Sequence, residues 1–317
     1  MDSHRYADLV LEGGGVKGTA LLGAVTVLAE HGYRFPRIAG TSAGAIVGSL
    51  AAAYQQSGRE VSGLVTVMRE LDYRSFLDAT LLGRLGFLGE GLEVLLHDGI
   101  YPGRFAHDWI AGELAACGVR TWADLRDPDP DSALPPEQRY RLVVTAADLS
   151  RGQLVRLPWD YGRYGLVADE QPVADAVRAS MSIPYYFRPV VLRGSRAAGS
   201  VSLVDGGLLS AFPIDIFDRG DGRPARWPTY GVQLEARPGA WQRAQPVHGP
   251  AKLTLAALRT LLGAHDAYRL ADENTAARTI FVDTESVNGL DFGIDAATKQ
   301  QLYLAGRRAA EGFVSGL

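Results

Sequence analysis

Two glycine-rich turns near the start of the chain each follow a short apolar run and precede a helix-length stretch of small and aliphatic residues. The first unit passes from a strand at Ala7–Leu11 through three glycines to a helix at Thr19–Ala29. The second passes from Arg37–Gly40 through the sequence GTSAG to an alanine-rich helix ending near Gln56. Strand–turn–helix units in tandem indicate parallel strands covered by helices. We therefore predict an α/β fold with a central, mainly parallel sheet flanked by helices.

Further runs along the chain extend this pattern to the C-terminus. We predict strands at Tyr140–Ala146, Pro189–Leu192, Val201–Val204, Thr229–Leu234 and Thr279–Val282, and helices at Val61–Leu71, Gly103–Ala116, Leu253–Ala271 and Ala296–Val314. A Pro- and Asp-rich loop at Asp127–Arg139 is expected to lie within one domain. The prediction is a single domain over residues 1–317, with the motifs in about 7–210 and residues 211–317 completing the sheet and its helical cover.

Composition excludes several classes of protein. The 317 residues are 47% hydrophobic and 21% charged, enough to fill a large core. With 32 basic and 36 acidic residues the net charge is −4, so we expect no nucleic-acid partner. The single cysteine, Cys117, favours a reducing compartment and supplies no metal cluster, and we expect neither a metal nor a cofactor.

The N-terminus lacks the basic-then-apolar order of a signal peptide. The longest uncharged stretch, Ile38–Gly58, contains many polar residues and glycines, which makes it a poor membrane span. We predict a cytoplasmic protein.

The pentapeptide GTSAG has the spacing of a nucleophile elbow. Gly40 and Gly44 flank Ser42 at two positions on either side, which permits the tight strand-to-helix turn that presents a serine hydroxyl at the end of a sheet. The helix that follows would direct its N-terminal amides and positive dipole end towards an anionic intermediate. Five small residues also form ordinary turns, so this pattern alone leaves both interpretations open.

The sequence EGGGVKG contains G-x-G-x-x-G at Gly13, Gly15 and Gly18, a spacing found in dinucleotide-binding turns. That interpretation expects an acidic residue about 20 positions on, and residues 34–41 contain none. A P-loop also fails, because Lys17 precedes the last glycine. We expect an oxyanion hole instead, formed by the amides of Gly14 and Gly15. Lys17 would orient the loop, meet an anionic head group or remain a solvated cation.

A serine nucleophile needs a base, and none of the six histidines occupies a convincing strand-end motif. Asp205 follows an apolar strand and precedes Gly206 and Gly207, whose missing side chains would let another backbone approach. Asp205 is therefore the candidate general base for Ser42, although Asp-Gly-Gly is also common in plain turns.

Together these three motifs resemble the patatin-like phospholipase family. EGGGVKG is similar to its oxyanion turn, GTSAG to its nucleophile elbow and Asp205-Gly206-Gly207 to its D-G-[AG] motif, and weaker similarity runs from about Ala7 to Val314. The resemblance implies a three-layer α/β fold and acyl-ester hydrolysis by a Ser42–Asp205 dyad, with Gly14 and Gly15 as oxyanion donors and no metal. Two positions depart from many relatives: Glu12 replaces Asp and Lys17 replaces Arg, which loses a bidentate donor.

The expected function is hydrolysis of phospholipid or other acyl esters through an acyl-enzyme, with transient contact at a membrane surface. No activating partner is identified by the sequence. One alternative is a Ser-His-Asp hydrolase of small esters, which would need His248 or His265. A second is a catalytically silent lipid- or nucleotide-binding module. The leucine-rich, glycine-interrupted segment Phe76–Tyr101 is expected to be either a lid over Ser42 or an irregular loop that covers the core.

Overall fold

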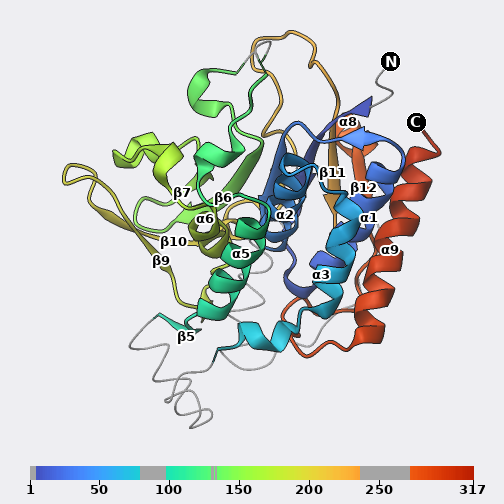
Figure 1. Cartoon of the computed structure of the whole chain (residues 1–317), viewed down its shortest axis with the longest axis horizontal. Coiled ribbons are helices and arrows are strands. Elements are labelled where there is room, and N and C mark those ends of the chain that lie inside the picture. Colours follow the sequence, from blue (N-terminus) through green and yellow to red (C-terminus); the bar gives the residue numbers. More distant parts are fainter. Residues whose placement is uncertain (1–4, 79–97, 130–131, 133, 236–271) are drawn as a thin grey trace.

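A central sheet crosses the molecule in the computed structural model, which describes residues 5–78, 98–129, 132, 134–235 and 272–317 (Figure 1). The strands are β1 Arg5–Tyr6, β2 Asp8–Leu11, β3 Tyr33–Arg34, β4 Ile38–Thr41, β5 Gly99–Tyr101, β6 Leu142–Asp148, β7 Gln153–Leu157, β8 Tyr185–Phe187, β9 Val190–Arg193, β10 Ser200–Asp205, β11 Thr229–Gln233 and β12 Thr279–Phe281. The helices are α1 Gly18–Glu30, α2 Ala43–Gln56, α3 Leu64–Glu70, α5 Arg104–Ala116, α6 Val173–Ser180, α8 Glu273–Ala277 and α9 Ala296–Val314.

The strand order of this sheet is β12-β11-β2-β4-β6-β10-β9, and β7 also pairs with β6. From β12 to β6 all neighbours are parallel, whereas β7, β10 and β9 are joined by antiparallel pairs. The two strand–turn–helix units supply β2 and β4 at its centre. The prediction of an α/β fold with a mainly parallel central sheet is therefore confirmed.

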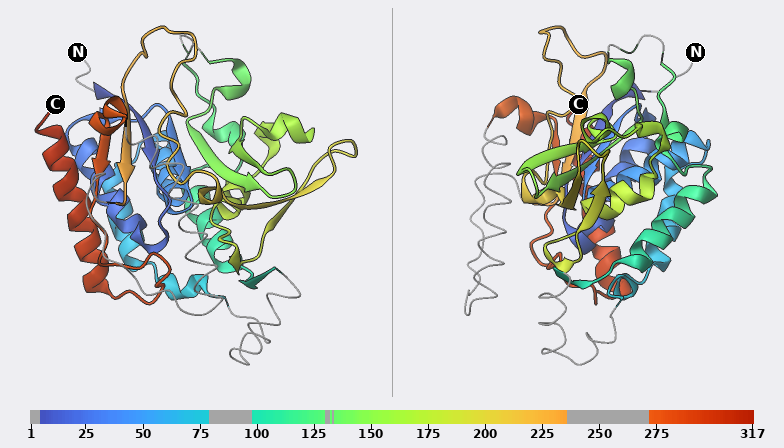
Figure 2. Two further views of the ribbon diagram at one scale, coloured as in Figure 1. Left: turned by 180° about the vertical axis from the view of Figure 1, so that it is seen from behind. Right: turned by 90° about the vertical axis from the view of Figure 1, so that its left-hand side faces the viewer.

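The buried strands place alternate side chains on opposite faces of the sheet. On one face, Leu9 of β2 and Ile38 of β4 belong to the large core formed with the helices. Helices α1 and α9 lie side by side on this part of the molecule (Figure 2). On the other face, Val10 and Ala39 pack in a smaller cluster with the non-helical segment 212–217. Both faces of the central strands are thus covered, as parallel strands require.

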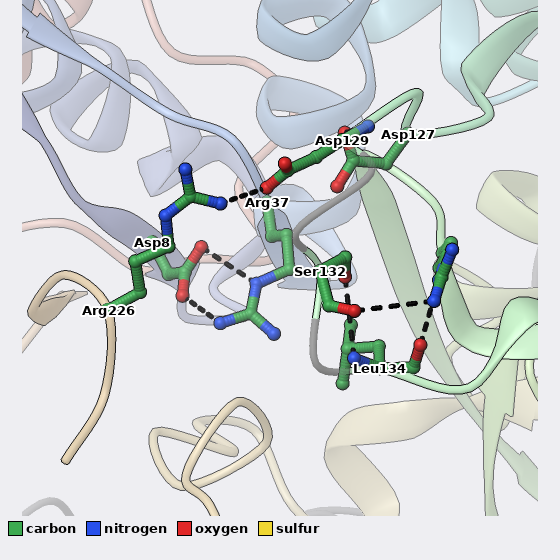
Figure 3. Close-up of polar contacts among 8 residues, drawn as sticks. Asp8, Arg37, Asp127, Asp129, Ser132, Leu134 and Arg226 are labelled. Carbon is green, nitrogen blue, oxygen red and sulfur yellow. Dashed lines mark hydrogen bonds and ion pairs between the residues drawn. The ribbon is translucent and has the colours of Figure 1, made fainter.

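An ion pair joins the starts of β2 and β4. Asp8 is fully buried, and the Arg37 guanidinium donates to both of its carboxylate oxygens, with Nε 2.9 Å from Oδ1 (Figure 3). Burial raises the pKa of Asp8, while Arg37 opposes that rise. Beside this pair, Arg226 binds Asp129. This ion pair fixes the start of both strands. Their register then aligns Leu11 with Gly40 at the other end of the two strands.

The polar loop 127–139, which lies where the parallel strands begin, is held by its own contacts. Arg139 donates to the carbonyl oxygens of Leu134 at 2.8 Å and Ser132 at 3.3 Å (Figure 3). A 3-10 turn at Pro136–Gln138 precedes β6. The predicted loop at 127–139 therefore lies at the end of the sheet where the parallel strands begin. The motifs lie at the other end, where these strands finish.

Two sequence expectations concern residues outside this description. The predicted helix at 253–271 lies outside the described residues, and so does most of the proposed lid at 76–101. Among the helices that the structure describes, none combines the length and apolar character needed to cross a bilayer.

Candidate active site

Strand register brings Ser42 and Asp205 to the same point of the sheet. Strand β4 runs parallel to β6 and ends with Thr41 opposite Thr145. Strand β10 runs antiparallel to β6 and ends with Asp205 opposite the next residue, Ala146. Because β7 occupies the other edge of β6 along this stretch, β4 and β10 share one edge and meet end to end. Ser42, which follows Thr41, therefore lies beside Asp205.

Ser42 occupies a strained turn between β4 and α2. Its backbone has φ 52° and ψ −118°, a conformation that costs a non-glycine residue about 1–3 kcal/mol. The two glycines of the motif allow close backbone packing: a β-carbon at Gly40 would overlap the carbonyl of Gly44, and one at Gly44 would overlap the carbonyl of Leu11. Helix α2 begins at Ala43, directly after the serine. The geometry is that of a nucleophile elbow.

Asp205 is buried at the end of β10 and is suited to accept a proton. Burial raises the pKa of Asp205 to about 6, although hydrogen bonds with the Ser42 side chain and the Gly207 amide act to lower it. The Gly207 amide lies 2.8 Å from Oδ1 of Asp205. A β-carbon at Gly206 would lie 2.6 Å from the Thr145 carbonyl oxygen, so this glycine lets the motif pack directly on β6.

The first glycine turn lies beside the serine. A β-carbon at Gly13 would be 3.2 Å from the Ser42 β-carbon. The Gly13 amide donates to the Ala211 carbonyl at 3.0 Å, so this donor is occupied. In contrast, the amides of Gly14 and Gly15 donate to no backbone carbonyl among the residues that the structure describes. These two amides therefore differ from the Gly13 amide, whose acceptor is a backbone carbonyl.

The residues around these glycines have supporting contacts. The Glu12 carboxylate is buried and accepts a hydrogen bond from the Leu234 amide, so it ties the turn to the end of β11. Lys17 ends the 3-10 turn Gly15–Lys17 and precedes α1. A β-carbon at Gly18 would lie 3.2 Å from that of Ala43, so this glycine lets the starts of α1 and α2 approach each other.

The described histidines bind elsewhere. His31 lies just after α1 with Nδ1 2.9 Å from the Val27 carbonyl oxygen. His107 lies 2.8 Å from Asp175 through Nε2 and 3.0 Å from Asp108 through Nδ1. Burial lowers the pKa of His107, but these two carboxylates outweigh it and raise the pKa overall. The other four, His4, His97, His248 and His265, lie outside the described residues.

Two further residues support the backbones of Ser42 and Asp205, and the sequence assigns neither of them a role. The Ser180 hydroxyl accepts a hydrogen bond from the Ser42 amide at 2.8 Å, and the Ser182 carbonyl accepts one from the Asp205 amide at 2.9 Å. Both residues lie within the range from about Ala7 to Val314 over which the sequence shows only weaker similarity to the family. A serine at the end of a short helix has no local pattern that would reveal such a contact.

Comparison with known protein families gives a match over the part of the chain that contains these motifs. The family model of patatin-like phospholipases matches residues 9–218, a range that contains the glycine turn, the elbow and the Asp-Gly-Gly motif. The chain belongs to the patatin-like phospholipase family. At the level of that family it is a lipid hydrolase.

Proteins similar to this patatin-like chain include some of similar length and some of greater length. An uncharacterized protein of Bacillus subtilis (strain 168), YqhO, is 37% identical over 316 residues, which cover 98% of both chains. The crystal structure of VipD from Legionella pneumophila has a TM-score of 0.53 at 17% identity, covering 99% of this chain and 67% of VipD. ExoU, in its heterodimeric complex with SpcU from the type III secretion system of Pseudomonas aeruginosa, has a TM-score of 0.49 at 21% identity, covering 99% of this chain and 52% of that one. The likeness to VipD supports the α/β fold.

Proposed function

We propose that this protein hydrolyses carboxylic esters of phospholipids through a Ser42–Asp205 dyad and an acyl-enzyme. The observation that carries the proposal is the meeting of β4 and β10 on one edge of β6, which sets the serine of the elbow beside a buried carboxylate. With a pKa of about 6, Asp205 is ionised at neutral pH and is a stronger base than an exposed aspartate. No histidine is required in this scheme.

In the acylation step, the Ser42 Oγ attacks the ester carbonyl carbon as Asp205 takes the hydroxyl proton. The carbonyl oxygen becomes an oxyanion, which the amides of Gly14 and Gly15 and the N-terminus of α2 stabilise. When the intermediate collapses, the bond to the alcohol oxygen breaks and Asp205 returns the proton to that oxygen. The acyl group is left on Ser42.

In the deacylation step, water attacks the acyl-enzyme carbonyl while Asp205 takes one of its protons. Collapse of the second intermediate breaks the bond to Ser42 Oγ, which recovers its proton from Asp205 and releases the fatty acid. The same two residues therefore serve both half-reactions. Family membership, rather than any feature of the site, supports phospholipid as the substrate.

We also propose that residues 1–317 act as one domain. The family model ends at residue 218. The later strand β11 nevertheless pairs with β2, the strand that leads into the oxyanion turn, and β12 extends the same sheet. The C-terminal third is therefore part of the scaffold of the site.

The test combines covalent labelling with product analysis. Purified protein is treated with a dye-labelled fluorophosphonate and, separately, with phosphatidylcholine vesicles. We expect a single adduct on Ser42 and release of fatty acid, both lost in Ser42→Ala while the unfolding temperature shows a folded protein. A folded wild type that takes no label, or equal fatty-acid release by Ser42→Ala, would refute the proposal.

A further inference from the structure

The nucleophile depends on a contact from outside its own turn. Pairing between β4 and β6 ends at Thr41, so the amide of Ser42 lies beyond the last strand pair. Ser42 itself is only 6% exposed, and a buried amide without an acceptor is costly. Ser180, which is fully buried at the end of α6, provides that acceptor through its Oγ at 2.8 Å.

The segment that carries Ser180 is itself firmly anchored. The buried guanidinium of Arg178 donates to the Ser182 Oγ at 2.5 Å and to the Gly103 carbonyl at 3.1 Å. It also donates to the carbonyls of Pro102 and Arg188. The Ser182 carbonyl in turn accepts a hydrogen bond from the Asp205 amide. The end of α6 and the two residues after it therefore contact both Ser42 and Asp205 through separate hydrogen bonds.

We propose that Ser180 is a positioning residue for the Ser42 nucleophile, holding the strained elbow in the orientation that directs the Ser42 hydroxyl towards Asp205. This inference rests on the proposed dyad. Ser180 acts through the backbone of Ser42 and touches neither the reacting atoms nor the substrate.

The contact also restricts where the oxyanion binds. The Ser42 amide donates to Ser180, which leaves it unavailable to a developing negative charge. The amides of Gly14 and Gly15 keep that role. Loss of the Ser180 hydroxyl would therefore act on the position of the nucleophile, and it would leave the oxyanion turn and the substrate contacts unchanged.

A misplaced nucleophile lowers the rate of the chemical step more than it weakens substrate binding, because small displacements of reacting atoms can cost about 100-fold in rate. We therefore expect Ser180→Ala and Ser180→Cys to lower kcat for p-nitrophenyl butyrate by about 10–100-fold, with KM within about twofold of wild type. The rate of fluorophosphonate labelling at Ser42 should fall by the same factor, since labelling needs no deacylation. The pH midpoint of kcat should move upwards, because a misplaced Ser42 hydroxyl weakens the hydrogen bond that lowers the pKa of Asp205.

Ser49→Ala is the matched control. Ser49 is also fully buried, lies in α2 and donates to the Ile46 carbonyl at 2.9 Å. Its loss tests whether removing a buried hydroxyl near the elbow is enough to slow the enzyme. We expect a similar decrease in unfolding temperature and an unchanged kcat.

The outcomes separate this inference from the proposed function. If Ser42→Ala is inactive while a folded Ser180→Ala or Ser180→Cys keeps the wild-type kcat, the positioning role is wrong and the dyad stands. A kcat loss shared equally by Ser49→Ala would also overturn it, because the effect would then be general destabilisation. If Ser42→Ala hydrolyses the ester at the wild-type rate, the dyad itself is wrong.

Discussion

The Gly289 carbonyl packs so closely on Gly15 that a β-carbon at Gly15 would overlap its oxygen, and the same carbonyl accepts the Val16 amide at 3.0 Å. Gly15 also has φ +60°. The approach is reciprocal, because a β-carbon at Gly289 would lie 2.6 Å from the Gly14 carbonyl oxygen. The loop before α9 thus holds the proposed oxyanion turn in place, although the two segments lie near opposite ends of the sequence.

We expect Gly15→Ala to lower kcat by about 100-fold or more with little change in KM, because the new methyl must push the turn or the loop away and misplace donors that act on the transition state. Gly58→Ala is the control. Gly58 shares the positive φ, at +73°, but a β-carbon there would have no neighbouring atom within 4 Å. Steady-state kinetics of the two variants should therefore differ sharply. Equal activity in both would remove Gly15 from the oxyanion hole.

The pH dependence of catalysis should report Asp205. Since the base must be ionised and its pKa is about 6, kcat/KM should be level above about pH 7 and fall about tenfold per pH unit well below 6. Asp205→Asn should lower kcat by about 10²–10⁴-fold, because the amide cannot accept the proton. A rate profile that is level down to pH 4.5 would contradict the assignment.

Asp205 should also destabilise the folded protein as pH rises. Its folded pKa of about 6 exceeds the ordinary value of 3.8, so the folded state holds the proton more tightly than the unfolded state. Stability therefore falls between about pH 4 and 6 by about 3 kcal/mol, and it is level above that range. The Asp205→Asn variant does not lose stability over this pH range, because its amide does not ionise. In urea titrations its stability relative to wild type should improve from pH 4 to pH 7, and no such change would mean that the carboxyl is not buried as described.

Local patterns in the sequence were enough for the elements that build the centre of the sheet. Strands β2 and β4 begin and end within about a residue of their predicted bounds, since an apolar run followed by glycines marks both ends. The sequence does not predict helix α6, because its eight residues include charged Asp175 and Arg178 and give too short a periodic pattern. The sequence does not predict strand β7 either, because Gln153 and Arg156 leave only two consecutive apolar residues between them.

The candidate site could likewise be predicted only in part from the sequence. The residues Ser42 and Asp205 could be chosen from turn chemistry, because each ends an apolar strand beside glycines. Their proximity could not, since it depends on β4 and β10 meeting in opposite directions on one edge of β6. The contacts of Ser180 and Gly289 join segments far apart in the chain, and no local pattern specifies such pairs.

Replacement of single histidines tests the remaining catalytic alternative. A Ser-His-Asp hydrolase would need His248 or His265, which lie outside the described residues. Because Asp205 already contacts Ser42 by hydrogen bonding, we expect His248→Ala and His265→Ala each to retain kcat within about twofold, where loss of a general base costs about 10²-fold or more. A loss of that size in either variant, with an unchanged unfolding temperature, would make that histidine the base.

The strained backbone of Ser42 should make the nucleophile position a site where activity and stability oppose each other. Glycine adopts φ 52° without the steric cost that serine bears, whereas alanine keeps that cost. Ser42→Gly and Ser42→Ala should both be inactive, because each lacks the hydroxyl. In urea titrations, however, Ser42→Gly should be more stable than Ser42→Ala by about 1 kcal/mol, since relief of strain exceeds the entropy that glycine loses on folding. If Ser42→Ala is the more stable of the two, the elbow is not strained and its orientation must be fixed by the Ser180 contact alone.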